Sequence, residues 1–391
     1  MIEFYYERLA APNLGYPNLA QGFSLPDSQE WHSLDHAWPR TVPLRLLMYL
    51  DWAKIPYSVV TEPNNFAWYP VGIAWFDHAI DYFKLMSAQS LALLRQKKLK
   101  VLFYYHEGDN PFVIKDRLDY LVANHNLHSD CYVFISANTM ARWCNNFLYV
   151  PDHELFFSHA NRYQHPPALN NNRRHVFTAL NRLHKWWRAA AMTDLIRNDL
   201  LDNSLWSYNT ANYLGSETYQ DSPIVLAWML DWRSRCEEFI NKSPYHCDLL
   251  TEQQHNTHGQ VNLDLYNQSW CHIVLETYFD VDQSGGTFIT EKTFKAIKYA
   301  QPFVIVGPAG TLAELRQMGY RTFDHVIDNS YDTIQDNSQR WFAIVRALKQ
   351  IKNNTNMQQW FDLCHDDLVH NQKMFLSRPL ETLNTLIKEL E

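Results

Sequence analysis

The sequence predicts an α/β protein with two doubly wound parallel sheets, each in its own domain. At 391 residues the chain is longer than one hydrophobic core usually serves. Short apolar runs alternate with helical patterns in two series, and this alternation is typical of parallel sheets with crossover helices. A polar stretch from His159 to Arg174, HANRYQHPPALNNNRR, separates the two series and has the composition of an interdomain linker. We therefore expect domains at about 1–165 and 166–391.

The first series is weak at its start and clear after residue 100. Its early signals are a helical pattern at 42–53, a strand-like YSVV and an amphipathic helix at 77–95. KVLFYY, ending at Tyr105, then predicts a buried strand, and a helix is expected from Pro111 to about Ala123. CYVFIS, ending at Ser136, is the next expected strand, and a further helix should follow it.

The second series repeats the alternation. Its expected strands are HVFTAL from His175, LWSYN, CHIVLE from Cys271 and PFVIV. Its expected helices lie at 186–197, 223–239, 290–299 and 311–318, and WFAIVRALKQI is the clearest helix near the end of the chain.

Composition limits the class of protein. Hydrophobic content of 46% and charged content of 19% are typical of soluble globular enzymes. A net charge of -8 argues against a protein that binds nucleic acid mainly by neutralising phosphates. The six cysteines are scattered without a C-x-x-C spacing, which favours a reducing, cytoplasmic location. No segment has the pattern of a signal peptide or the length of a membrane span, so we expect neither.

Polar residues or glycines follow most of the expected strands. In open α/β sheets, ligands bind at the carboxyl ends of the strands, so these positions are candidates for a site. They are His106-Glu107-Gly108-Asp109 in the first series, and Asn181-Arg182, Tyr208-Asn209, Glu276-Thr277 and Gly307-Pro308 in the second.

A basic cluster follows the first strand of the second series. Arg182, Lys185 and Arg188 are spaced by three residues and would share one helical face if the helix began early. Such a cluster at a strand end could hold a diphosphate. The alternative is a solvated basic turn.

A second group of basic residues lies in FITEKTFKAIKYAQPFVIVGPAG. Thr290 suits the N-cap of a helix, and Glu291 both matches the positive helix end and pairs with Lys295. Lys292 is not explained in this way, and a bound anion would account for it. The turn after PFVIV is neither G-x-G-x-x-G nor a Walker loop, which disfavours NAD-dependent and P-loop enzymes.

These residues carry a resemblance to a known family. FITEKTFKAIKYAQPFVIVGP resembles the donor-site segment of GT-B glycosyltransferases of the alpha-1,3-fucosyltransferase type, with its Tyr-x-Thr-Glu-Lys box and Pro-Val-x-x-Gly-Pro strand. CHIVLETYF is similar to that family's Phe-Glu-Asn-Ser strand, with Glu276 at the glutamate and Thr277 and Tyr278 in place of Asn and Ser. The wider pattern, including YYHEGDNP, LNR and GYRTFDHVIDNSYD, resembles glycosyltransferases of bacteriophages and large viruses.

The resemblance implies a GT-B fold, in which two Rossmann-like domains face each other across a cleft and the C-terminal domain binds a nucleotide-sugar. Glu291 would then bind the ribose and Lys292 the phosphate. Arg182 and Lys185 would take the place of the phosphate-binding basic pair of many such enzymes. The full set of expected donor-binding residues is Arg182, Lys185, Arg188, Tyr208, Glu276, Thr290, Glu291, Lys292 and Gly307.

Two groups of residues in the sequence are possible metal ligands. Asp280-Val281-Asp282 has the Asp-x-Asp form that holds a divalent metal in the other large glycosyltransferase fold, but two aspartates around a valine are common by chance. The second group matches no standard zinc spacing and reads as a polar loop; its members are His246, Cys247, His255 and His258. We expect no metal, and no cofactor apart from the nucleotide-sugar co-substrate.

The general base is expected from the first domain. An acceptor hydroxyl needs a group that takes its proton, and the strand KVLFYY delivers three candidates. We predict Glu107 as the base and Asp109 as a helix cap or acceptor ligand, with His106 in reserve. The alternative is that the acids only cap the helix that begins near Pro111, a role that Asp109 or Asn110 would fill.

The sequence therefore predicts a cytoplasmic, metal-independent glycosyltransferase that moves a sugar from a nucleotide-diphosphate sugar to an acceptor hydroxyl. The acceptor is a glycan, a small molecule or modified DNA, and the location would be the host cytoplasm if the protein is phage-encoded. One alternative is a phage enzyme that glycosylates a hydroxylated DNA base after flipping it. The other is a non-catalytic module that binds a nucleotide or a glycan.

Overall fold

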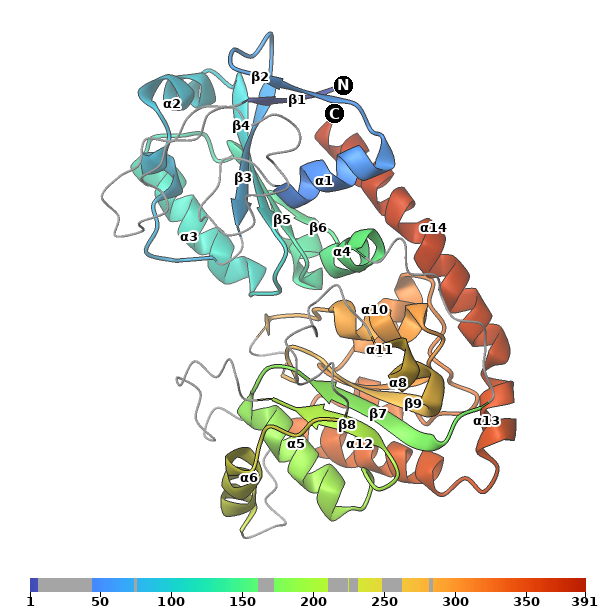
Figure 1. Ribbon diagram of the computed structural model, residues 1–391. Coiled ribbons are helices and arrows are strands. Elements are labelled where there is room, and N and C mark those ends of the chain that lie inside the picture. The colour runs from blue at the N-terminus through green and yellow to red at the C-terminus, as the bar shows by residue number, and fades with distance from the viewer. Residues whose placement is uncertain are drawn as a thin grey trace. The chain divides into compact units, whose positions relative to one another are not determined.

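The computed structural model describes residues 1–5, 44–73, 76–160, 172–209, 224, 231–247, 262–280 and 284–391. The chain divides into two compact units (Figure 1). Unit 1 comprises Met1–His159, Gln283–Phe288 and Arg378–Glu391, and unit 2 comprises Ala160–Asp282 and Ile289–Ser377. The sequence predicts two continuous domains. In the structure, the later segments Gln283–Phe288 and Arg378–Glu391 belong to unit 1.

Unit 1 is built on a six-stranded sheet in the order β2-β1-β3-β4-β5-β6. All of its pairs are parallel. The strands are β1 (Ile2–Tyr5), β2 (Tyr57–Val60), β3 (Ala67–Ile73), β4 (Leu99–Tyr105), β5 (Tyr132–Ser136) and β6 (Phe147–Tyr149).

The alternation of side chains along β4 divides the core of unit 1 into two layers. Phe103 and its alternate neighbours pack with α2 (Ala88–Arg95) and α3 (Pro111–Asn124). Leu102 and Tyr104 face the opposite core, which contains residues of the remaining helices of the unit. These helices are α1 (Leu44–Ala53), α4 (Asp152–Ala160) and the last part of α14 (His365–Leu390). Helices therefore cover both faces of the sheet (Figure 1).

Several predicted elements of unit 1 are confirmed, namely the strands YSVV, KVLFYY and CYVFIS and the helix from Pro111. The continuous helix expected at 77–95 is wrong. The structure has a 3-10 helix, η3 (Tyr82–Leu85), and then α2, because the side chains of Asp81 and Ser87 each cap a separate helix start. The helix expected after β5 is a 3-10 helix, η4 (Thr139–Trp143).

Unit 2 is built on a four-stranded sheet in the order β10-β9-β7-β8, and all of its pairs are parallel. Its strands are β7 (His175–Asn181), β8 (Leu205–Tyr208), β9 (Ser269–Leu275) and β10 (Phe303–Val306). Its helices are α5 (Trp186–Arg197), α6 (Trp232–Asn241), α8 (Leu263–Gln268), α10 (Glu291–Lys298), α11 (Thr311–Gln317), η6 (Ser330–Thr333), α12 (Asn337–Lys352), α13 (Met357–Leu363) and the first part of α14. The four strands predicted for this half are confirmed. Of the helix expected at 223–239, the structure describes residue 224 and the part from Asp231 onward.

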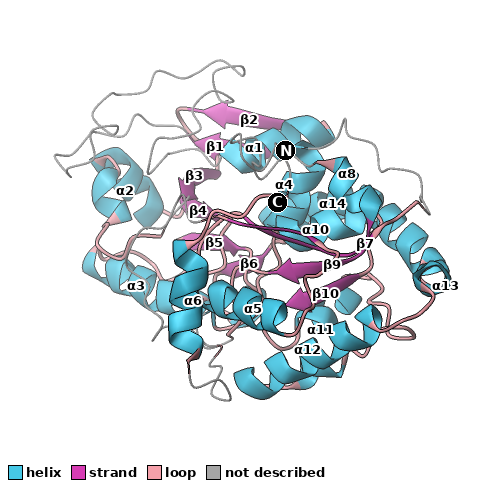
Figure 2. Ribbon diagram, turned by 60° about the horizontal axis from the view of Figure 1, so that its bottom comes forward, coloured by secondary structure: helices cyan, strands magenta, loops and turns pink. Residues whose placement is uncertain are grey.

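Helices pack on both faces of the second sheet (Figure 2). Trp341 of α12 donates a hydrogen bond to Asp194 of α5 at 2.9 Å, so these two helices share one face. The ring centroids of Tyr266 in α8 and Tyr299, which follows α10, lie 5.3 Å apart, and the ring of His272 in β9 packs against Tyr266. Within the described ranges, no helix is both long enough and apolar enough to cross a lipid bilayer.

The order of the second sheet identifies its binding edge. From β7 the chain moves first to β8 on one side, and later to β9 and β10 on the other. The strand order therefore reverses between β7 and β9, and a crevice for ligands is expected at the carboxyl ends of these two strands. The protein is thus a mixed α/β protein with two parallel sheets flanked by helices, compatible with two Rossmann-like domains.

Candidate functional site

Glu276 is the first residue after β9 and its side chain is fully buried. Its carboxylate accepts hydrogen bonds from the backbone N–H of Thr290 at 3.2 Å and from the Thr290 hydroxyl at 2.5 Å. The hydroxyl of Thr293 donates a further hydrogen bond at 2.5 Å. The carboxylate therefore attaches the first turn of α10 to the end of β9.

Lys292 lies at this attachment point. Thr290 is the N-cap of α10, as the sequence predicts, and its hydroxyl accepts from the backbone N–H of Lys292 at 3.4 Å. The ammonium of Lys292 bends back to donate to the hydroxyls of Thr290 at 2.9 Å and Thr277 at 3.3 Å. It also lies 3.8 Å from the carboxylate of Glu291. The positive charge is thus held over the end of β9.

Two further cations lie near Lys292. Burial lowers the pKa of Lys295 to about 8; the carboxylate of Glu291 opposes this shift, while the charges of Lys292 and Arg182 add to it. Arg182 belongs to the loop after β7, so one of the charges that act on Lys295 comes from the neighbouring strand end. Arg182, Lys292 and Lys295 thus bring positive charge to the side of the sheet where β7 and β9 end.

Arg188 has a different position from the one expected. Because α5 begins at Trp186, Arg182 and Lys185 precede the helix, and the three basic residues do not share one helical face. Arg188 is buried, and its guanidinium donates to the carbonyl oxygens of Leu183 at 3.0 Å and Glu276 at 2.5 Å. It therefore ties the loop after β7 to the end of β9.

Lys185 occupies the N-cap of α5 and makes no side-chain capping hydrogen bond. Its ammonium lies 4.9 Å from the ring centroid of Tyr278, in the segment that follows β9. A cation at the positive end of a helix is unfavourable on its own, and a nearby anion would offset that cost.

Tyr208 contacts the loop that follows β7 through His184. It is fully buried at the end of β8, and its hydroxyl lies 2.7 Å from Nδ1 of His184. Burial and the neighbouring Arg188 lower the pKa of His184 to about 4, so this imidazole is neutral at physiological pH. The sequence reasoning missed His184, although it stands inside the basic run that was singled out.

Asn181, the last residue of β7, is also buried, and its side-chain oxygen has no hydrogen-bond partner among the described residues. Its amide nitrogen makes only long contacts, at 3.5 Å to the sulfur of Met192 and 3.4 Å to the carbonyl oxygen of Ser207. A polar group therefore remains available at the same edge of the sheet.

Gly307 lies beside Glu276: an added Cβ would be 3.5 Å from the Glu276 Cβ. The helix start after the Gly307–Gly310 turn is filled by the protein itself. The carboxylate of Asp332 accepts from the backbone N–H groups of Leu312 at 2.8 Å and Ala313 at 2.9 Å. Gly310, with φ of 87°, adopts the left-handed conformation that this tight turn requires. The first turn of α11 therefore already holds an anion, a carboxylate of this chain.

The candidate base residues follow β4 in unit 1. Asn110, and not Asp109, is the N-cap of α3, so the capping role expected for Asp109 is wrong. Asp109 instead accepts a hydrogen bond from the hydroxyl of Tyr105. Glu107 is 31% exposed, and its carboxylate lies 3.4 Å from Nε2 of His106.

Gly108 separates these two acids and makes a close approach to Phe288. A Cβ added at this glycine would overlap the Phe288 ring, which also packs 5.1 Å from the ring of His153. The backbone oxygen of Gly108 accepts from the buried amide of Asn138 at 2.8 Å. The turn that presents Glu107 is therefore tightly supported.

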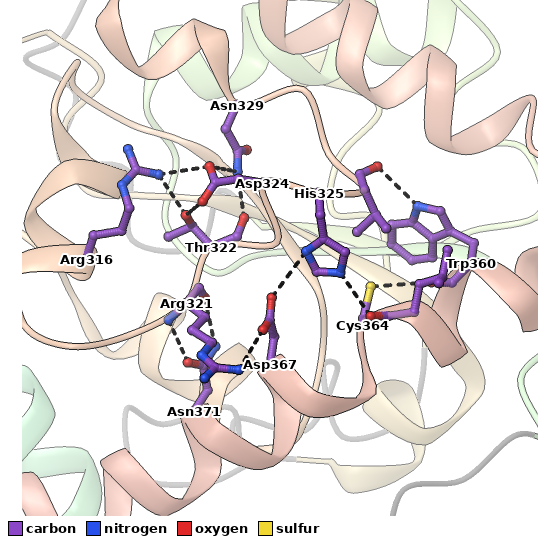
Figure 3. Close-up of polar contacts among 12 residues, drawn as sticks. Arg316, Arg321, Thr322, Asp324, His325, Asn329, Trp360, Cys364, Asp367 and Asn371 are labelled. Atoms are coloured by element: carbon purple, nitrogen blue, oxygen red, sulfur yellow. Dashed lines mark hydrogen bonds and ion pairs between the residues drawn. The ribbon is translucent and has the colours of Figure 1, made fainter.

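A polar network surrounds the segment GYRTFDHVIDNSYD and is a possible second site because of its many charged residues (Figure 3). Arg316 binds Thr322 at 2.7 Å and Asp324 at 3.0 Å. Asp367 of α14 lies 3.2 Å from the Arg321 guanidinium and 3.6 Å from Nδ1 of His325. Since the acids and bases drawn there satisfy one another, we interpret the network as a brace that fastens this loop to α13 and α14.

The possible metal ligands do not converge within the described residues, where no group of three or more His, Cys, Asp or Glu side chains could hold an ion. His246 and Cys247 are in that part of the chain, whereas His255, His258 and Asp282 lie outside it.

Comparisons with family models and curated proteins identify no relative of this chain, so a function has to be argued from its residues. No family model matches the chain, and no curated protein does so either. The structure brings together most of the expected donor-binding residues in unit 2, at the ends of β7, β9 and β10, and it places Glu107 and Asp109 at the end of β4 in unit 1.

Proposed function

We propose that the protein is a glycosyltransferase of the GT-B type, in which unit 2 binds a nucleotide-diphosphate sugar. The observation that carries the proposal is the position of the Lys292 ammonium, which the hydroxyls of Thr290 and Thr277 hold at the carboxyl end of β9. This strand lies beside β7, the strand that Arg182 follows. When the bond between the sugar and the diphosphate breaks, negative charge develops on the leaving group, and fixed positive charges stabilise it. The resemblance of the Thr290–Lys292 box to fucosyltransferase-type donor sites supports the same reading.

In the proposed mechanism the residues take the roles that the resemblance and the sequence predict. Lys292 contacts the phosphate next to the leaving oxygen, Arg182 and Lys185 bind from the loop after β7, and Glu291 accepts hydrogen bonds from the ribose. Glu107 of unit 1 removes the proton from the acceptor hydroxyl. In this mechanism the protein's cations supply the charge that a divalent metal supplies in other transferases.

Nucleoside diphosphates are expected to raise the melting temperature of the protein, because a ligand that binds the folded state selectively stabilises it. A panel of GDP, UDP, CDP and their sugars in a thermal-shift assay identifies the base of the nucleotide.

Lys292→Ala should weaken the affinity for the preferred nucleotide by about tenfold or more, since a charge-assisted hydrogen bond is lost. Lys349→Ala, which removes an exposed lysine of α12, is the control and should bind like the wild type.

Two results would contradict the proposal. One is that none of the nucleotides shifts the melting temperature. The other is that a chelator abolishes the activity of the wild-type protein, since the mechanism assigns no step to a metal.

Binding of a diphosphate is expected to be coupled to proton uptake by Lys295. In the free protein its pKa is about 8, so above that pH much of this side chain is neutral. A bound anion favours the ammonium and raises the pKa again. Calorimetry at about pH 8.5 in buffers of different ionisation enthalpy should show uptake on the order of half a proton, and affinity should fall as the pH rises further.

The other titratable groups near Lys295 show which side chain takes up the proton. His272 remains neutral, because burial and then the charge of Lys295 lower its pKa to about 3. Lys295→Met should therefore abolish the uptake, and equal uptake in this variant would contradict the assignment. In the free protein the same group makes unfolding less favourable as the pH rises from about 8 to 10.5, because the unfolded chain then binds more protons.

A further inference from the structure

We propose that Glu276 is a positioning residue that orients the ammonium of Lys292 through the hydroxyl of Thr290. This inference rests on the proposed function in one respect, namely that Lys292 contacts the donor diphosphate. It assigns to Glu276 an action on the ligand through another side chain, whereas the resemblance described in the sequence analysis implies that Glu276 binds the donor itself.

The direction of the hydrogen bonds supports this role. The Glu276 carboxylate receives three donors, from the Thr290 N–H, the Thr290 hydroxyl and the Thr293 hydroxyl, which is the pattern of an acceptor-only group. The Thr290 hydroxyl has a single proton, and the 2.5 Å contact directs it to Glu276. Its lone pairs therefore face the ammonium of Lys292, 2.9 Å away.

Glu276 itself is held in place from several sides. Its carbonyl oxygen accepts from the guanidinium of Arg188 at 2.5 Å, and its side chain has no exposed surface. A carboxylate that is fully covered and bound to three donors of its own chain is not a direct ligand for a nucleotide. It can, however, prevent the Thr290 hydroxyl from turning, and a fixed Lys292 loses less side-chain entropy when an anion binds.

Matched variants separate the relay from simple anchoring of α10. Thr290→Val removes the hydroxyl that links Glu276 to Lys292, and Thr290→Ser restores it. Thr293→Val removes another donor to Glu276 and leaves the link to Lys292 intact. The probe is inorganic pyrophosphate, with affinity measured by calorimetry on protein that circular dichroism shows to be folded.

Thr290→Val is expected to lower pyrophosphate affinity about tenfold or more, whereas Thr290→Ser and Thr293→Val should stay within about threefold of the wild type. Equal losses in Thr290→Val and Thr293→Val would overturn the relay, because both would then act only by loosening the helix start. A loss in Thr290→Ser as large as that in Thr290→Val would overturn it as well.

A second readout keeps this inference separate from the proposed function. If the wild type binds neither pyrophosphate nor nucleotides, the proposed function fails, and the relay is then judged from lysine-labelled protein by NMR. The two ε protons of Lys292 should have separate chemical shifts in the wild type and in Thr293→Val, and a single averaged shift in Thr290→Val. An averaged shift in the wild type would overturn the relay.

Discussion

Glu107→Gln is expected to lower the rate of sugar transfer by about 10²- to 10⁴-fold, the usual contribution of a general base. The amide has the shape of the carboxylate but cannot take a proton from the acceptor hydroxyl. Glu107 suits this role better than its neighbour, because its carboxylate is partly exposed at the end of β4 and has His106 beside it. Donor binding, measured by thermal shift, should be unchanged, because the donor residues belong to unit 2.

Asp109→Asn is the matched control for this experiment. Asp109 already accepts a hydrogen bond from Tyr105, and an amide oxygen can still accept it, so transfer should fall much less than in Glu107→Gln. A Glu107→Gln protein with full transfer activity would remove the assignment. A larger loss in Asp109→Asn would move the role of the base to Asp109.

Asp152→Ala is expected to lower the free energy of unfolding by about 3–5 kcal/mol, because breaking a buried pair leaves its partner uncompensated. The fully buried carboxylate of Asp152 binds the Arg45 guanidinium at 2.5 Å and the hydroxyls of Tyr49 at 3.0 Å and Tyr104 at 2.6 Å. Burial, and then the charge of Asp152, raise the pKa of both tyrosines, so both stay protonated and donate. Without the carboxylate, these three donors have no acceptor there.

Denaturant unfolding of the full chain measures this effect. Asp366→Ala is the control, because Asp366 is 95% exposed and its contact with His365 is worth little in solvent. A loss below about 1 kcal/mol in Asp152→Ala would mean that water or other groups replace the carboxylate, and would contradict the prediction.

Two of the strands that the sequence predicts correctly, β9 and β10, owe their clear signal to continuous burial. The residues of β9 and β10 are buried along their whole length, so each reads as an unbroken apolar run between turn residues. β3 was missed because AWYPVGI contains Pro70, which argues against a central strand. β1 was missed as well. The restart of the helix at Ser87 also depends on local capping that the apolar pattern conceals.

The site could be predicted where local chemistry determines it. Thr290 as N-cap of α10 follows from the preference of helix starts for hydroxyl side chains. Arg188 and Asp332 could not be assigned in this way, because each is defined by contacts with a distant segment. Arg188 reaches Glu276, 88 residues away, and Asp332 accepts from the backbone N–H of Leu312, 20 residues earlier in the chain. Residue spacing carries no information about such partners.

The division of α14 between the two units has a consequence for the order of folding. Leu383, Leu386, Ile387 and Leu390 pack in the same core as Ile2 and Phe4 of β1, and Trp68 of β3 donates to the carbonyl oxygen of Leu390. The strands of unit 1 are therefore synthesised first but lack part of their hydrophobic cover until the final turns of the last helix emerge. The ribosome therefore finishes the residues of unit 2, which end at Ser377, before those of unit 1. This order is the reverse of the usual one, in which the N-terminal domain is completed first.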